Sequence, residues 1–143
     1  MKIVATLPTY NESENIIPLI RSLLKVSPSL HVLVIDDNSP DETWRLVGEE
    51  VKRNPRVHLL HRKTERGRGS AGVAGFQKAL ELGADLVVEM DADWSHHPRF
   101  LKRMLAATRR ADVVIGSRLV LSLIHISEPT RLRRISYAVF CLK

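Results

Sequence analysis

The chain has 143 residues, of which 44% are hydrophobic and 27% are charged, and its net charge is +6. This composition indicates one folded domain with a substantial core and excludes a disordered chain. No run of about 18 apolar residues occurs, which argues against a membrane-spanning helix. Met1 and Lys2 lead directly into a strand-like segment, which argues against a secretion signal. The single cysteine, Cys141, excludes an internal disulfide and a cysteine-based zinc site.

The charge distribution argues against a nucleic-acid partner. Half of the net charge lies beyond Val120, where four basic residues stand against Glu128, and the rest of the chain is only mildly basic. Binding to nucleic acid favours a concentrated basic stripe with interleaved aromatic residues, which this sequence lacks. We expect a protein that handles phosphate groups locally.

Short apolar segments alternate with helical patterns along most of the chain. We predict buried strands over residues 2–7, 31–35, 56–61, 85–90 and 112–115. We predict helices over 12–25 with Asn11 as cap (or from Ile17, because of Pro18), from Ser39 in a capping box with Glu42, over 70–82 and over 98–109. This alternation is typical of an α/β fold with a mostly parallel sheet and helices on both faces.

Acidic side chains gather at one edge of the predicted sheet. Ligands of open parallel sheets bind beyond the carboxyl ends of the strands. Five carboxylates follow the ends of the first, second and fourth strands: Glu12, Asp36, Asp37, Asp91 and Asp93. Their convergence predicts a polar ligand site at this edge.

The segment Asp91-Ala92-Asp93 follows the fourth strand directly. Residues two apart in an extended chain point to the same side, so both carboxylates can face one site. Two close carboxylates repel each other unless a cation lies beside them, and hard oxygen ligands favour Mg²⁺ or Mn²⁺. We predict that Asp91 and Asp93 hold such an ion; the alternative is ordinary turn chemistry after a strand.

Other residues at this edge suit a nucleotide. Asp37, in preference to Asp36, can accept hydrogen bonds from a base or a ribose. The glycine-rich segment 66–72 precedes a helix and reads either as a phosphate loop or as a plain surface loop. Arg118, after the fifth strand, can neutralise a diphosphate. The adjacent pair at 96–97 points in two directions, so the two histidines are not expected to share one metal ion.

These strand-end motifs resemble the N-terminal catalytic region of family 2 glycosyltransferases, and within it the dolichol- or polyprenol-phosphate mannose synthase group. The likeness runs from Met1 to about Val120 and rests on four segments in order, 8–12, 36–41, 90–98 and 116–118. Segment 66–72 departs from the family, because it carries arginines where more apolar residues are usual, and Trp94 stands where a smaller apolar residue is usual.

The resemblance implies a GT-A fold, GDP-mannose as donor and a dolichyl or polyprenyl phosphate as acceptor. It implies a peripheral protein at the cytoplasmic membrane face, and attack by the lipid phosphate with inversion at the sugar. It also implies roles for single residues: Pro8, Tyr10, Glu12, Ile35 and Asp37 would hold the guanosine end, Asp91 and Asp93 would bind Mg²⁺ or Mn²⁺ and the diphosphate, Ala92 would line the donor pocket, and Arg118 would lie near the diphosphate.

Three other functions remain open at this point. One is a family 2 transferase that uses UDP-glucose or another sugar nucleotide, and another is a sugar-nucleotide-binding module without catalysis. The third is a nucleotidyltransferase, which would normally show a glycine-rich, lysine-containing loop after the first strand. This chain has residues 8–12 in that place, which argues against the third.

The residues after Val120 do not continue the family pattern. Residues 121–131 are what a transposase-based sequencing-library adapter encodes, and residues 135–143 match its distal end running into poly-A. We therefore expect 1–120 to be the nucleotide-sugar-binding part of a truncated glycosyltransferase domain and 121–143 to be a non-native tail. The alternative is a natural basic amphipathic segment for membrane surfaces. Such a truncation would leave out the acceptor-side elements, so we expect poor or absent transfer activity.

Overall fold

The computed structural model describes residues 1–117 and 136–141 of the chain. Helices and strands alternate along it, and the strands form one six-stranded sheet. The strands are β1 (Ile3–Thr9), β2 (Leu30–Asp36), β3 (Val57–His61), β4 (Leu86–Glu89), β5 (Val113–Ser117) and β6 (Ser136–Cys141). The helices are α1 (Ile16–Leu24), α2 (Thr43–Arg53), α3 (Arg68–Glu81), the 3-10 helix η1 (Pro98–Phe100) and α4 (Leu101–Ala107).

The sheet is mostly parallel, and the predicted α/β fold class is confirmed. Its strand order is β3-β2-β1-β4-β6-β5, and β1 pairs in parallel with both β2 and β4. Strand β6 was not predicted, and it runs antiparallel between β4 and β5. It belongs to the segment 121–143, whose origin as a non-native tail stays a prediction and most of which lies outside the described residues.

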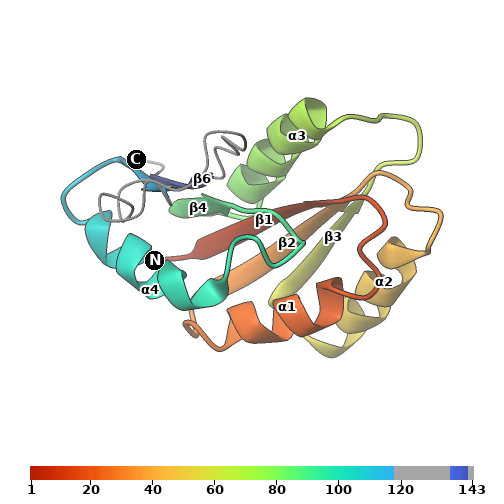
Figure 1. Ribbon diagram of the computed structural model, residues 1–143, viewed down its shortest axis with the longest axis horizontal. Coiled ribbons are helices and arrows are strands. Elements are labelled where there is room, and N and C mark those ends of the chain that lie inside the picture. Colours follow the sequence, from red (N-terminus) through yellow and green to blue (C-terminus); the bar gives the residue numbers. More distant parts are fainter. Residues whose placement is uncertain (118–135, 142–143) are drawn as a thin grey trace, which may run out of the picture.

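The two faces of the sheet carry two hydrophobic clusters. On β1, Ile3, Ala5 and Leu7 belong to the cluster shared with α1 and α4, whereas Val4 belongs to the cluster beneath α3. Figure 1 shows α3 alone on one face and α1, α2 and α4 on the other. Helix α3 approaches β2 closely at Gly75, where an added Cβ would lie 3.0 Å from Ile35 Cδ1. None of the helices described in the structure is long and apolar enough to cross a membrane.

Strand β1 continues through Pro8, two residues beyond the predicted end. The Thr6 carbonyl accepts from Met90 on the β4 side, and the Thr9 carbonyl accepts from Asp37 on the β2 side. Backbone groups alternate in direction, so the nitrogen of Pro8 faces the β4 side, beyond Glu89, the last residue of β4. Proline therefore removes no ladder hydrogen bond there.

Two helix starts predicted from local caps are wrong, whereas the alternative start at Ile17 for the first helix is within one residue of the structure. Helix α1 begins at Ile16 and its N-cap residue is Asn15, so Asn11 is no cap and Pro18 falls in the first turn, where proline is tolerated. Helix α2 begins at Thr43 rather than at Ser39. Residues of the two loops before these helices instead bond to each other, and local capping patterns do not contain such contacts.

Candidate active site

A cleft of about 410 Å³ opens at the carboxyl ends of β1, β2 and β4, beside the start of α3. Its lining comprises Pro8, Thr9, Tyr10, Glu12, Asp37, Arg66, Gly67, Arg68, Ala71, Asp91, Ala92 and Asp93. Most of the site residues predicted from the sequence thus come together here. The exceptions are Ile35, which is fully buried beneath α3, and Arg118, which lies outside the described residues.

The chain turns sharply where it leaves each strand at this edge. Asn11, Asn38 and Trp94 have positive φ values of 57°, 56° and 64°, and Gly67 has a φ of 118°. Left-handed backbone is uncommon for residues other than glycine, and for a residue as bulky as Trp94 it is a genuine outlier. Such outliers gather at functional sites, where the surrounding structure holds them in place. The edge of the sheet therefore has the backbone character of a binding site.

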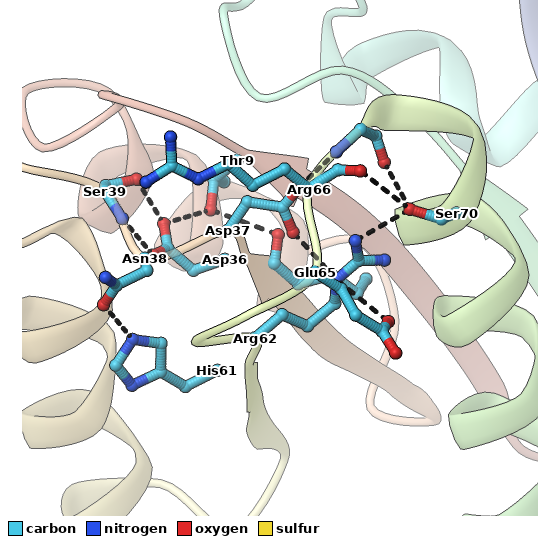
Figure 2. Close-up of polar contacts among 12 residues, drawn as sticks. Thr9, Asp36, Asp37, Asn38, Ser39, His61, Arg62, Glu65, Arg66 and Ser70 are labelled. Atoms are coloured by element: carbon cyan, nitrogen blue, oxygen red, sulfur yellow. Dashed lines mark hydrogen bonds and ion pairs between the residues drawn. The ribbon is translucent and has the colours of Figure 1, made fainter.

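Asp36 organises the loops after β1 and β2. Its buried carboxylate accepts hydrogen bonds from the Thr9 hydroxyl (2.8 Å), the Ser39 N–H (2.9 Å) and the Ser39 hydroxyl (2.6 Å) (Figure 2). The Asn11 N–H in turn donates to Ser39 Oγ at 3.0 Å. Asp36 therefore has a structural role, and its hold on Ser39 explains why Ser39 does not cap α2. Of the two aspartates, Asp37 lines the cleft, and its role as the nucleotide ligand stays a prediction.

Asp37 ties the second strand to the glycine-rich segment. Its Oδ2 accepts from the Gly67 N–H at 3.0 Å, and its Oδ1 lies 2.9 Å from Arg62 Nε in an ion pair that lacks hydrogen-bond alignment. Arg62 also donates to the Ser70 hydroxyl at 2.8 Å, within α3 (Figure 2). Arg62 was not among the predicted site residues, because its partner Asp37 is distant in the sequence.

Asp91 is held between a buried histidine and an exposed arginine. Its N–H donates to His96 Nδ1 at 2.9 Å, and its Oδ2 lies 3.8 Å from His96 Nε2. Because Nδ1 accepts, the proton of the neutral ring is assigned to Nε2, which faces the carboxylate. Asp91 Oδ1 forms an ion pair with Arg68, the first residue of α3. His97 instead accepts from the Arg99 N–H and caps η1, so the two histidines have different partners.

Asp93 is an ionised carboxylate supported by its own loop. Burial would raise its pKa, but hydrogen bonds from Ser95 outweigh burial and hold the pKa below its ordinary value of 3.8. The Ser95 N–H donates to Asp93 Oδ1 at 3.0 Å. At neutral pH, Asp93 therefore presents a full negative charge at the cleft.

The donor set of this cleft fits a divalent ion that is shared with a substrate. No group of three or more histidine, cysteine or acidic side chains that could hold a metal occurs among the described residues. Mg²⁺ in nucleotide sites is commonly held by one or two carboxylates together with substrate phosphates. Asp91 and Asp93, both on the cleft wall, match that pattern.

The fold and the acidic strand ends define a GT-A type of glycosyltransferase domain. The family described as "Glycosyl transferase family 2" matches residues 5–124, and the chain belongs to that family. A solved mannosyltransferase from Pyrobaculum calidifontis shares the fold with a TM-score of 0.61 at 23% identity, over 81% of this chain and 34% of that one. That structure is described as a complex with GDP-Man and Mn²⁺.

Two curated relatives have specific names. An "Undecaprenyl-phosphate mannosyltransferase" of Micrococcus luteus is 45% identical over 96% of this chain and 57% of its own length. A "Polyprenol monophosphomannose synthase" of Mycolicibacterium smegmatis is 46% identical over 80% of this chain and 44% of its own length. The chain therefore spans about half the length of these relatives, and the match to the first extends beyond Val120.

Proposed function

We propose that this chain is the donor-binding part of a polyprenyl-phosphate mannosyltransferase that uses GDP-mannose. The observation that carries the proposal is the meeting of Asp37, Asp91 and Asp93 on one cleft at the carboxyl edge of the sheet. The names of the two bacterial relatives support the acceptor class and the sugar. The complex of the Pyrobaculum protein with GDP-Man and Mn²⁺ supports the donor and a divalent ion.

In this proposal the cleft has a nucleoside end and a diphosphate end. Pro8, Tyr10, Glu12 and Asp37 receive the guanosine, and Asp37 accepts hydrogen bonds from the base. Ile35 acts from behind, by supporting the wall on which Asp37 stands. At the other end, Ala92 lines the pocket while Asp91 and Asp93 hold Mg²⁺ or Mn²⁺ against the diphosphate. Arg118 adds a cation there.

The reaction breaks the bond between the anomeric carbon and the diphosphate and forms one to a phosphate oxygen of the lipid. A bound divalent ion would stabilise the negative charge that develops on the departing diphosphate. A phosphate monoester has a second pKa of about 6, so the attacking oxygen is already ionised at neutral pH and needs no protein base. Direct in-line attack inverts the anomeric centre.

The proposal extends to the organisation of the chain and its place in the cell. Residues 1–120 form the nucleotide-sugar-binding part and 121–143 a non-native tail, and the chain binds donor with little or no transfer. Because the acceptor is a lipid phosphate, the complete enzyme works peripherally at the cytoplasmic membrane face. Mass spectrometry of the protein from its native source would test the tail, since the adapter-encoded peptide should be absent.

Calorimetry separates the candidate functions. GDP-mannose should bind in the presence of Mn²⁺ and weakly in its absence, and UDP-glucose should not compete. Preference for UDP-glucose would replace the donor, and loss of all sugar-nucleotide binding would overturn the proposal. A transfer assay with polyprenyl phosphate then distinguishes an enzyme from a binding module: robust product would contradict the inactive state, and product with retained configuration would contradict direct attack.

A further inference from the structure

The ion pair between Arg68 and Asp91 places a protein cation where the proposed function needs a metal ion. Arg68 stands at the start of α3, whereas Asp91 follows β4, so the pair spans the cleft. The Arg68 side chain is 71% exposed and that of Asp91 is 24% exposed. The guanidinium therefore reaches the carboxylate from the solvent side, the side from which a substrate would enter.

The two partners of Asp91 differ in how firmly they are held. His96 is 2% exposed and is fixed to the backbone of Asp91, so it cannot leave without breaking the loop. Arg68 has a long, exposed side chain, and ion pairs of exposed side chains contribute little to stability. Of these two contacts, the one to Arg68 is the one that can exchange.

The segment that carries Arg68 is anchored to Asp37, so its backbone can stay in place while the side chain exchanges partners. Gly67 donates its N–H to Asp37, and Arg66 and Arg68, on either side of it, both line the cleft. The backbone is thus tied to the nucleoside end, while an arginine on either side of Gly67 lines the cleft. A guanidinium can bind two phosphate oxygens at once. At an exposed site it can therefore leave a carboxylate partner for a phosphate group.

We propose that Arg68 is an exchangeable counter-ion of the diphosphate site. In the absence of donor it neutralises Asp91, and when a divalent ion and a nucleoside diphosphate enter together, Arg68 moves from the carboxylate to a diphosphate oxygen. Arg66 provides a second contact to the diphosphate. The exchange makes the cleft select the metal–diphosphate pair over the free metal ion. This inference rests on the proposed function of the same cleft.

The test is calorimetry on the full 143-residue chain with three probes: Mn²⁺ alone, GDP with Mn²⁺, and guanosine. In Arg68→Leu, Mn²⁺ alone should bind about threefold to fivefold more tightly, because its competitor is gone. GDP with Mn²⁺ should bind at least about tenfold more weakly, because a charge-assisted contact is lost. Guanosine should bind as it does to the unaltered chain, which also shows that the variant is folded.

Matched variants isolate the exchange. Arg66→Leu should weaken GDP binding without improving Mn²⁺ binding, because the ion pair to Asp91 belongs to Arg68. Arg68→Lys keeps the charge and should hold Mn²⁺ affinity near that of the unaltered chain. Arg103→Leu, an exposed position on α4, should change neither.

Each outcome supports or overturns a distinct claim. Unchanged or weaker Mn²⁺ binding in Arg68→Leu would refute the counter-ion role, and unchanged GDP affinity would refute the transfer to diphosphate. In both cases the unaltered chain still binds GDP with Mn²⁺, so the proposed function stands. If the unaltered chain itself shows no Mn²⁺-dependent binding of GDP, the proposed function fails first.

Discussion

The two ends of the cleft are built differently. At the nucleoside end, Asp36 is fully buried and saturated with hydrogen bonds, and Asp37 is tied to Gly67 and Arg62. At the diphosphate end, Asp91 and Asp93 stand on one loop after β4, and the contact of Asp91 across the cleft is an exposed ion pair. The polar contacts of the nucleoside end are therefore formed by folding alone, without a ligand.

This difference indicates a division of labour. A preformed polar network orders no further groups when a ligand arrives, so it suits recognition of a constant part of the ligand. A pair of carboxylates with an exchangeable partner suits a ligand that brings its own cations and charge. The nucleoside end should therefore be sensitive in stability measurements, and the diphosphate end in binding measurements.

The largest expected effect is on the diphosphate end. Asp93→Ala removes one of two proposed metal ligands, so Mn²⁺ should no longer strengthen GDP binding, a loss of at least about 100-fold. Calorimetry of GDP with and without Mn²⁺ measures it. The free energy of unfolding should fall only slightly, through loss of the hydrogen bond from Ser95, and Asp112→Ala, an exposed aspartate after α4, is the control. An unchanged response to Mn²⁺ would remove the metal assignment.

The next effect falls on the nucleoside end and on stability. Asp36→Ala leaves the Thr9 hydroxyl and two donors of Ser39 without their buried acceptor, which should lower the free energy of unfolding by about 2 kcal/mol. Urea unfolding followed by circular dichroism measures the loss. Asp36→Asn keeps an acceptor and should lose less. A smaller loss of unfolding free energy in Asp36→Ala than in Asp93→Ala would contradict this difference between the two ends.

A smaller effect concerns His96 as a positioning residue for Asp91. His96→Leu removes the acceptor of the Asp91 N–H and should weaken binding of GDP with Mn²⁺ about tenfold. In His96→Asn the side-chain oxygen can accept in place of Nδ1, so affinity should stay within about threefold of the unaltered chain. Guanosine binding should be the same in both. Equal losses in the two variants would contradict a positioning role through this hydrogen bond.

The sequence predicted what depends on local pattern. Buried strands read as continuous apolar runs, and the rule that ligands meet the carboxyl ends of parallel strands places Asp37, Asp91 and Asp93 at one edge, as the structure does. The strand bounds differ by one or two residues. Pro8 illustrates why: whether a proline ends a strand depends on the neighbouring strand, which a local pattern does not contain.

Contacts between distant segments could not be predicted. Ser39 and Glu42 match a capping box, but Ser39 bonds to Asp36 and Asn11 instead. Arg62 pairs with Asp37, and Arg68 with Asp91 across 23 residues of chain, and neither partner can be read from the residues around the arginine. The antiparallel strand β6 was not predicted for another reason: residues 121–143 are expected to be a non-native tail, so no element is assigned there.

The smallest effect tests how the diphosphate end keeps its charge. Asp93 has a pKa below 3.8 in the folded chain, because hydrogen bonds from Ser95 outweigh burial. A carboxyl whose pKa is depressed by folding stabilises the fold above its unfolded pKa, and this contribution disappears as the pH falls through the lower, folded pKa. Ser95→Ala removes the side-chain hydroxyl that lowers the pKa of Asp93 but keeps the N–H bond, so this pKa should rise part of the way back.

The ¹³C chemical shift of the Asp93 carboxyl, followed against pH, measures this change directly, with Ser70→Ala as a control at the nucleoside end. A titration midpoint at or above 3.8 in the unaltered chain would mean that burial dominates at this loop. In that case the bound metal ion, and not the loop, would favour the ionised form of Asp93. A midpoint below 3.8 that rises in Ser95→Ala would mean that the loop keeps Asp93 charged before any ligand arrives. Binding of the donor would then change only the partner of Asp91, by the exchange of Arg68.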